Sequence, residues 1–191
     1  MVMEQEIRVQ AEAAKAASYR LAALRTDARN KALCAMADAL MAHRDKILHE
    51  NAADVEDAKT SGMRASYLDR LRLDEARIAS MAEGLRLTAA LPDPLGREDY
   101  SVRRPNGLEI RRMRVPLGVV GMIYEARPNV TADAIGLCLK SGNAVLLRGD
   151  DEGGEFLKPE LRGKHIVHAA ACHIEVRMRR GFRREQFSCL R

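Results

Sequence analysis

Residues 116–149 read PLGVVGMIYEARPNVTADAIGLCLKSGNAVLLRG, and this stretch decides the fold. Two apolar runs, 119–124 and 144–148, flank a helical pattern over 131–141. Short strands on either side of one helix predict a right-handed parallel strand–helix–strand unit. Ser141-Gly142-Asn143 supplies a glycine stop behind the helix. The pattern therefore indicates the α/β class, with the start of a Rossmann-like parallel sheet.

A charged string, Glu125-Ala126-Arg127-Pro128-Asn129, follows the first strand at its carboxyl end, where open parallel sheets bind ligands. Pro128 fixes its own φ and keeps Arg127 out of the helical region, so we expect a stiff turn. Either Asn129 or Thr131 can cap the helix. A carboxamide N–H beside the first helical amides also suits a developing oxyanion. Spacing alone leaves both roles for Asn129 open and slightly favours the cap.

Glycine gives no dinucleotide fingerprint in this stretch. The sequence has no GxGxxG, and Gly118 and Gly121 form a GxxG within the first strand. We interpret this pair as a sign of close packing and not of phosphate binding.

The first 97 residues predict four helices with apolar positions at helical spacing. The first covers 4–25, and Thr26 or Asp27 is expected to cap the second. The third is expected to run from Asp45 to about 61–62. Asp74 is predicted to cap the fourth, which the Pro-Asp-Pro segment at 92–94 ends.

An Asn106-Gly107 pair separates two partly alternating, arginine-rich runs over 98–114. Asn-Gly is the strongest signal for a two-residue hairpin turn, because both residues tolerate positive φ. The sequence therefore predicts a polar hairpin, for which an exposed ribbon is favoured over a binding ribbon.

Composition narrows the class of protein further. The 191 residues carry a net charge of +5, which is too small to require nucleic acid and is compatible with an anionic substrate. No apolar run is long enough for a membrane span, and the acidic N-terminus is not a secretory signal. The four cysteines have no framework spacing, so reduced thiols and a cytoplasmic location are expected.

The composition changes after Gly149. Residues 172–191 hold six arginines and two acids. A weak helical pattern at 165–178 would place His165, His168 and Cys172 on one face, but no supporting ligand pair is present and we expect no metal site. The arginine cluster could hold nucleic-acid phosphates, although an unstructured charged tail is favoured.

The sequence over about residues 8–149 resembles the gamma-glutamyl phosphate reductase (glutamate-5-semialdehyde dehydrogenase) family, a branch of the aldehyde dehydrogenase superfamily. YEARPNVTADAIGLCLKSGNAVLLRG carries the resemblance most specifically, supported upstream by NAADVEDAK, YLDRLRLDEARI, LPDPLG, PNGLEI and RVPLGVVG. It implies reduction of gamma-glutamyl phosphate by NADPH through a cysteine thioester, in L-proline biosynthesis. It also implies an aldehyde dehydrogenase-like fold, of which this chain holds an incomplete part.

The resemblance also assigns roles residue by residue. Asn129 matches the residue that holds the thioester oxyanion. Glu125, Ala126 and Arg127 match the nicotinamide side of the cofactor groove, and Arg148 matches a basic position near the adenosine ribose. The nucleophilic cysteine of the family falls in a second domain, and none of the four cysteines here occupies its motif.

These matches divide the chain into four expected parts. They are the helical part of a cofactor-binding domain (1–97), an oligomerisation hairpin (98–115), the first strand–helix–strand unit of that domain (116–149) and an unrelated tail (150–191). We expect the tail to be frame-shifted or disordered, the chain to be inactive alone and its full-length form to be a homo-oligomer that binds neither membrane nor nucleic acid. The alternative is a non-catalytic fragment that binds a nucleotide or pairs with other subunits.

Overall fold

The computed structural model describes residues 2–125, 127–150, 166–170 and 173–175. It contains six helices and six strands in these ranges. The helices are α1 (Val2–Ala23), α2 (Thr26–Ala42), α3 (Arg44–Thr60), α4 (Ala65–Leu71), α5 (Glu75–Ala90) and α6 (Pro128–Lys140). The strands are β1 (Glu98–Arg103), β2 (Glu109–Met113), β3 (Val119–Glu125), β4 (Ala144–Asp150), β5 (Ile166–Ala170) and β6 (His173–Glu175).

The predicted strand–helix–strand unit is confirmed. β3 and β4 pair in parallel with Val119 opposite Ala144 and Glu125 opposite Asp150, and α6 connects them. Gly142 takes φ +70° directly behind α6, which explains the glycine in the stop. The carboxyl ends of both strands therefore meet at one edge of the sheet, next to the start of α6.

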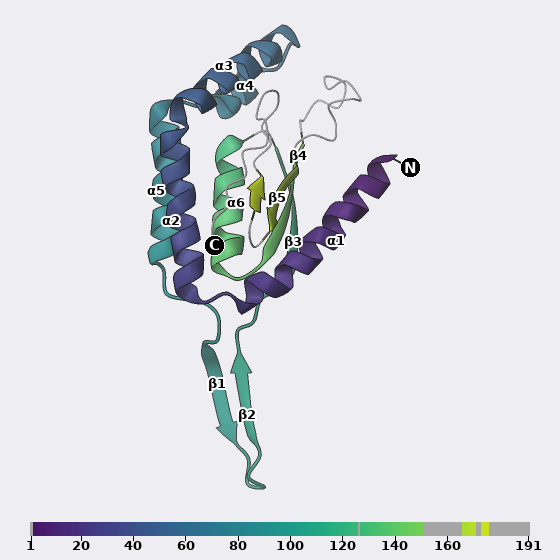
Figure 1. Cartoon of the computed structure of the whole chain (residues 1–191), viewed down its shortest axis with the longest axis vertical. Helices are drawn as coiled ribbons and strands as arrows, with labels where there is room; N and C mark the ends of the chain where they lie inside the picture. The colour runs from purple at the N-terminus through teal and green to yellow at the C-terminus, as the bar shows by residue number, and fades with distance from the viewer. Residues whose placement is uncertain (1, 126, 151–165, 171–172, 176–191) are drawn as a thin grey trace.

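Helices cover both faces of this sheet. Figure 1 shows α1 along one face, α6 against the other, and α2 and α5 outside α6. Alternate residues of β3 and β4 pack against the α6 side of the sheet, where Val145 and Leu147 are fully buried beside Ile135. A second cluster joins α2 and α5 to α1 through Leu33, Leu85 and other apolar residues.

All four helices predicted upstream are present, as α1, α2, α3 and α5, and the prediction for the cap of α5 is confirmed. The Asp74 carboxylate accepts a hydrogen bond from the Arg77 N–H at 2.7 Å. The prediction for α2 is wrong in its cap, because Arg25 holds the cap position and Thr26 lies inside the helix. The Thr26 hydroxyl instead donates to Asp93. The short helix α4 was not predicted.

Two buried cations join the ends of the long helices. The Arg29 guanidinium of α2 forms an ion pair with Asp93, in the turn after α5, and the two side chains are 3% and 22% exposed. The Lys140 ammonium, at the end of α6, donates to the Ala89 carbonyl and to the Asn30 side chain, both at 2.7 Å. Burial lowers the pKa of Lys140, as does Arg29, while Asp93 opposes this shift.

The predicted hairpin is present and projects from the body of the molecule as a two-stranded ribbon (Figure 1). Its turn differs from the prediction. The Arg104 N–H donates to the Leu108 carbonyl, the Gly107 N–H donates to the Arg104 carbonyl, and Gly107 takes the left-handed φ of +86°. The connection is therefore a three-residue loop ending in a glycine bulge, not a two-residue turn.

β3 forms one edge of the described sheet, whose order is β3-β4-β5-β6. Its outer residue Ile123 is 72% exposed. A Cβ on Gly121, in the middle of β3, would meet nothing within 4 Å, so the expected close packing at this glycine is wrong.

Residues 166–170 and 173–175 form antiparallel strands against β4 and each other, which contradicts the helical pattern expected at 165–178. His168 therefore lies in a strand and not on a helix face, while His165 and Cys172 lie outside the described residues. Most of the expected frame-shifted or disordered tail lies outside the described residues. In the described part of the chain, no helix combines the length and apolar character needed to cross a bilayer.

Candidate active site

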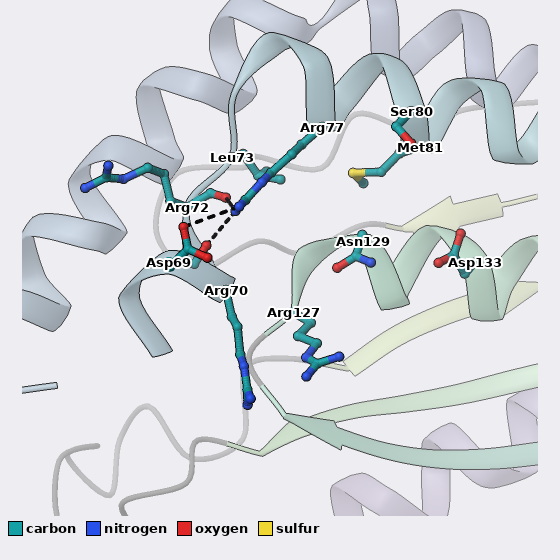
Figure 2. Close-up of a pocket in the computed structure, with 10 residues that line it drawn as sticks. All are labelled: Asp69, Arg70, Arg72, Leu73, Arg77, Ser80, Met81, Arg127, Asn129 and Asp133. Atoms are coloured by element: carbon teal, nitrogen blue, oxygen red, sulfur yellow. Dashed lines mark hydrogen bonds and ion pairs between the residues drawn. The ribbon is translucent and has the colours of Figure 1, made fainter. Parts of the chain in front are cut away.

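A pocket of about 320 Å³ lies between α5 and the start of α6. Its walls come from α4 and the linker behind it, from α5 and from α6, and Figure 2 shows them together. The lining side chains are Asp69, Arg70, Arg72, Leu73, Arg77, Ser80, Met81, Arg127, Asn129 and Asp133. Four arginines against two carboxylates give the pocket a positive balance, which favours an anionic ligand.

Asn129 lies in the first turn of α6 and lines this pocket. The prediction that Asn129 or Thr131 caps the helix is wrong, because α6 begins at Pro128 and Arg127 holds the cap position without a side-chain hydrogen bond. Proline suits this place, where its missing N–H has no helical partner to lose. The Asn129 side chain is exposed, and neither its carboxamide nor its backbone N–H has a hydrogen-bond partner among the described residues. Two donors are therefore open at the pocket wall.

The start of α6 is fixed to the end of β3 by a side-chain contact. The Tyr124 phenol oxygen lies 2.5 Å from the Thr131 hydroxyl oxygen. Burial raises the pKa of Tyr124, while the hydrogen bond with Thr131 opposes this shift. The phenol is therefore neutral at physiological pH, and the contact sets where the first turn of α6, with Asn129, stands relative to the strand.

The pocket arginines differ in how they are held. Arg77 donates to the carbonyls of Asp69 and Arg72 at 2.5 Å each and reaches the Asp69 carboxylate at 3.4 Å. The Arg70 guanidinium lies over the Tyr67 ring. Arg127 is exposed, and no ion pair to it occurs in the described residues. Arg77 therefore closes the end of α4, whereas Arg127 can meet a ligand.

Asp133 stands one turn after Asn129 on the same face of α6. Its carboxylate lies next to α5, where a Cβ on Gly84 would be 3.7 Å from it. Burial against α5 raises the pKa of Asp133, and no charged group contributes to that shift. Sequence analysis missed this residue, and the i, i+4 spacing from Asn129 was the signal that could have found it.

The structure places the other predicted site residues at the same edge of the sheet. Glu125 is the last residue of β3, and Arg148 lies in β4 opposite Ile123. Arg127 and Asn129 line one pocket. Ala126 lies outside the described residues. Predicted cofactor positions and the predicted oxyanion donor are thus gathered where parallel strands bind nucleotides.

Neither cysteine with described side-chain surroundings faces this pocket. Cys34 is exposed on α2, and Cys138 is buried in α6, where burial raises the pKa of its thiol. A buried neutral thiol is a poor nucleophile. Within the described ranges, no cluster of three or more His, Cys, Asp or Glu could hold a metal ion.

The sequence is similar to gamma-glutamyl phosphate reductases. That of Caldanaerobacter subterraneus subsp. tengcongensis is 56% identical over 166 residues, which make up 87% of this chain and 39% of the relative. The chain thus spans about two fifths of the length of that relative. A match of 166 residues in a chain of 191 reaches residue 166 or beyond, so the similarity extends past Gly149. No family model matches the chain.

Solved structures agree with the sequence match. The crystal structure of gamma-glutamyl phosphate reductase from Thermotoga maritima superimposes with a TM-score of 0.73 at 42% identity, over 75% of this chain and 35% of that one. An NAD-dependent benzaldehyde dehydrogenase from Corynebacterium glutamicum superimposes with a TM-score of 0.55 at 28% identity, over 74% of this chain and 28% of that one. The predicted aldehyde dehydrogenase-like α/β fold is therefore confirmed.

Proposed function

The chain belongs to the gamma-glutamyl phosphate reductase family of the aldehyde dehydrogenase superfamily, and on that premise we propose that its site serves the NADPH-dependent reduction of gamma-glutamyl phosphate to glutamate 5-semialdehyde. This reaction is a step of L-proline biosynthesis. The observation that carries the proposal is the exposed Asn129 carboxamide, in the first turn of a helix at the carboxyl edge of a parallel sheet. A cytoplasmic location follows from the same proposal.

In this mechanism a cysteine thiolate attacks the acyl carbonyl, phosphate leaves and a thioester forms. Bound NADPH would supply the hydride that reduces this thioester to the aldehyde, with release of the thiolate. Asn129 and the backbone N–H beside it donate to the carbonyl oxygen as negative charge develops there. These donors and the positive charge of the pocket are in place before the substrate binds. They therefore lower the free-energy cost of forming the negative charge on the carbonyl oxygen.

We assign the cofactor to the adjoining end of the sheet. From the family resemblance we assign Glu125, Ala126 and Arg127 to the nicotinamide side and Arg148 to the recognition of a ribose 2′-phosphate. Adjacent carboxyl ends of β3 and β4 fit a nucleotide, and an arginine is the side chain that best recognises a phosphate. A preference for NADPH over NADH would then depend on Arg148.

Neither Cys34 nor Cys138 can supply the thiolate from its place in α2 or α6. We therefore expect the 191 residues, assayed by themselves, to bind nucleotide without completing turnover. The ribbon of β1 and β2 would serve assembly into a homo-oligomer. The alternative function is a nucleotide-binding or subunit-pairing module without catalysis. It is favoured because neither Cys34 nor Cys138 lines the pocket, so neither is placed to act as the nucleophile.

Two measurements on this chain test the proposal. Fluorescence titration should show saturable NADPH binding that Arg148→Ala weakens by about tenfold or more, while NADH binding changes little. Arg103→Ala, on the exposed ribbon, is the matched control and should leave both affinities unchanged. Absence of saturable NADPH binding would contradict the proposal.

Phosphate-dependent, NADP-linked oxidation of glutamate semialdehyde separates the two functions. We expect no turnover from the chain alone. Turnover at an ordinary enzymatic rate would show that the chain is complete as an enzyme. In that case Asn129→Ala should lower kcat by about 100-fold or more, as loss of an oxyanion donor does.

A further inference from the structure

One carboxylate of the pocket has no partner. Of the two pocket acids, Asp69 is reached by Arg77, whereas Asp133 has neither a hydrogen bond nor an ion pair among the described residues. Figure 2 shows Asp133 on α6 beyond Asn129, on the side of the pocket formed by Ser80 and Met81 of α5. A Cβ on Gly84 of α5 would lie 3.7 Å from this carboxylate, so the Asp133 side chain stands against α5. An unpaired carboxylate in a pocket wall favours a cationic group of a ligand.

The distance along α6 matches the substrate. The Cβ atoms of residues i and i+4 of a helix stand about 5–6 Å apart, so the Asn129 and Asp133 side chains leave α6 at about that separation. In an extended glutamyl chain, four bonds join the reacting carbonyl carbon to the α-nitrogen, a span of roughly 5 Å. With the carbonyl oxygen at Asn129, the α-nitrogen reaches the Asp133 carboxylate.

The positive charge of the pocket requires a carboxylate such as Asp133 if the α-ammonium group of the substrate is to bind there. Arg70, Arg77 and Arg127 attract the phosphate and the α-carboxylate of the substrate but repel its α-ammonium group. Asp133 is the only pocket acid in the described residues that is not already engaged by Arg77. It stands on α6, whereas Asp69, Arg70 and Arg77 belong to α4 and α5. The pocket thus presents its unpaired negative charge at one end.

We propose that Asp133 binds the α-ammonium group of the glutamyl substrate and so selects an amino acid over a simple dicarboxylic acid. This inference rests on the proposed function, because it places the reacting carbonyl at Asn129. It adds a specificity residue that contacts the substrate away from the reacting atoms.

Two stable probes test the inference on the 191-residue chain. L-glutamic acid γ-monohydroxamate and glutaric acid monohydroxamate differ only in the α-ammonium group, and both carry the carbonyl and the carboxylate. Calorimetric titration should give at least about tenfold tighter binding of the glutamic probe, as expected for a charge-assisted hydrogen bond. Asp133→Asn should make the two affinities equal, and Asp133→Glu should restore part of the preference.

Glu83→Gln is the matched control, because it removes one acid from the exposed surface of α5 outside the pocket and should keep the preference. Circular dichroism shows that each variant is folded. A preference that survives Asp133→Asn, or equal binding of both probes to the unchanged chain, overturns the inference and leaves the proposed function standing. Failure of both probes to bind also overturns it, and only the further loss of NADPH binding contradicts the proposed function.

Discussion

The phenol oxygen of Tyr124, the penultimate residue of β3, lies 2.5 Å from the hydroxyl oxygen of Thr131 in the first turns of α6. The contact crosses the turn that carries Arg127, Pro128 and Asn129. Because proline already stiffens that turn, the hydrogen bond fixes the remaining freedom of the helix start. The donor at Asn129 is thus held by residues on both sides of it.

Tyr124→Phe should lower the free energy of unfolding by about 1 kcal/mol, since it removes one hydrogen bond and keeps the packed ring. Urea unfolding followed by circular dichroism measures the change. Tyr19→Phe, on the exposed surface of α1, is the control and should have little effect. Equal effects of the two variants would mean that the Thr131 contact contributes nothing.

Asp93→Asn should lower the free energy of unfolding by about 3–5 kcal/mol, because it leaves the Arg29 guanidinium buried without a counter-charge. The Nε and Nη1 atoms of Arg29 already lack partners among the described residues, so the guanidinium has no alternative acceptor in place. Asp45→Asn removes an acid that is 85% exposed and should cost far less. A small effect of Asp93→Asn in urea unfolding would contradict the role given to this ion pair.

The Asp93 carboxylate should also account for part of the loss of stability at low pH. Burial opposes ionisation of Asp93, but hydrogen bonds from Thr26 and the Leu95 N–H, together with the Arg29 charge, lower its pKa below the usual value. A lowered folded pKa stabilises the fold above the unfolded pKa of about 3.9, and this contribution is lost as the pH falls through the folded pKa. Stability measured from pH 6 to pH 2 should therefore fall less in Asp93→Asn. Parallel curves for the two proteins would contradict this.

Asp133→Asn should stabilise the free chain at neutral pH, whereas Asp93→Asn should destabilise it. Burial raises the pKa of Asp133, so its ionisation costs stability as the pH rises through the unfolded pKa and then the folded pKa. We expect a melting temperature higher by on the order of 1 °C at pH 7 and unchanged below about pH 3, where both states are protonated. A lower melting temperature at pH 7 would show that Asp133 has a structural partner.

Gly142→Ala should destabilise the chain by more than Gly107→Ala. Both glycines have positive φ, so both variants pay a backbone cost of about 1 kcal/mol. At Gly142 the added Cβ would also lie 2.8 Å from a Leu95 methyl carbon and 3.2 Å from the Pro116 ring, whereas at Gly107 it would meet nothing within 4 Å. The difference between the two variants in thermal unfolding isolates the steric cost.

The sequence predicts those parts of the fold that local chemistry controls. Asp74 caps α5 because an aspartate directly before an apolar periodic run can accept a hydrogen bond from a free N–H in the first turn of the helix. The β3–α6–β4 unit follows from the change of apolar period around 119–148. α4 was missed because its seven residues carry no buried position, and therefore no periodic signal.

The candidate site shows where local signals fail. Thr26 and Asn129 are good capping residues in isolation, but Asp93 claims the Thr26 hydroxyl and the pocket leaves the Asn129 amide open. Arg29 and Lys140 appear as ordinary surface cations in the sequence, and only the packing of α2, α5 and α6 buries them. The i, i+4 spacing puts Asp133 on the same helix face as Asn129, but only the packing of α5 beside α6 shows that this face lines a pocket.

Gly142 lies where the two ends of the ribbon of β1 and β2 meet the rest of the molecule. The chain enters the ribbon past Leu95 and leaves it past Pro116, and both residues press on the turn at the C-terminal end of α6. Asn129 stands at the other end of that helix. The projecting ribbon and the oxyanion donor are therefore attached to opposite ends of one helix, α6.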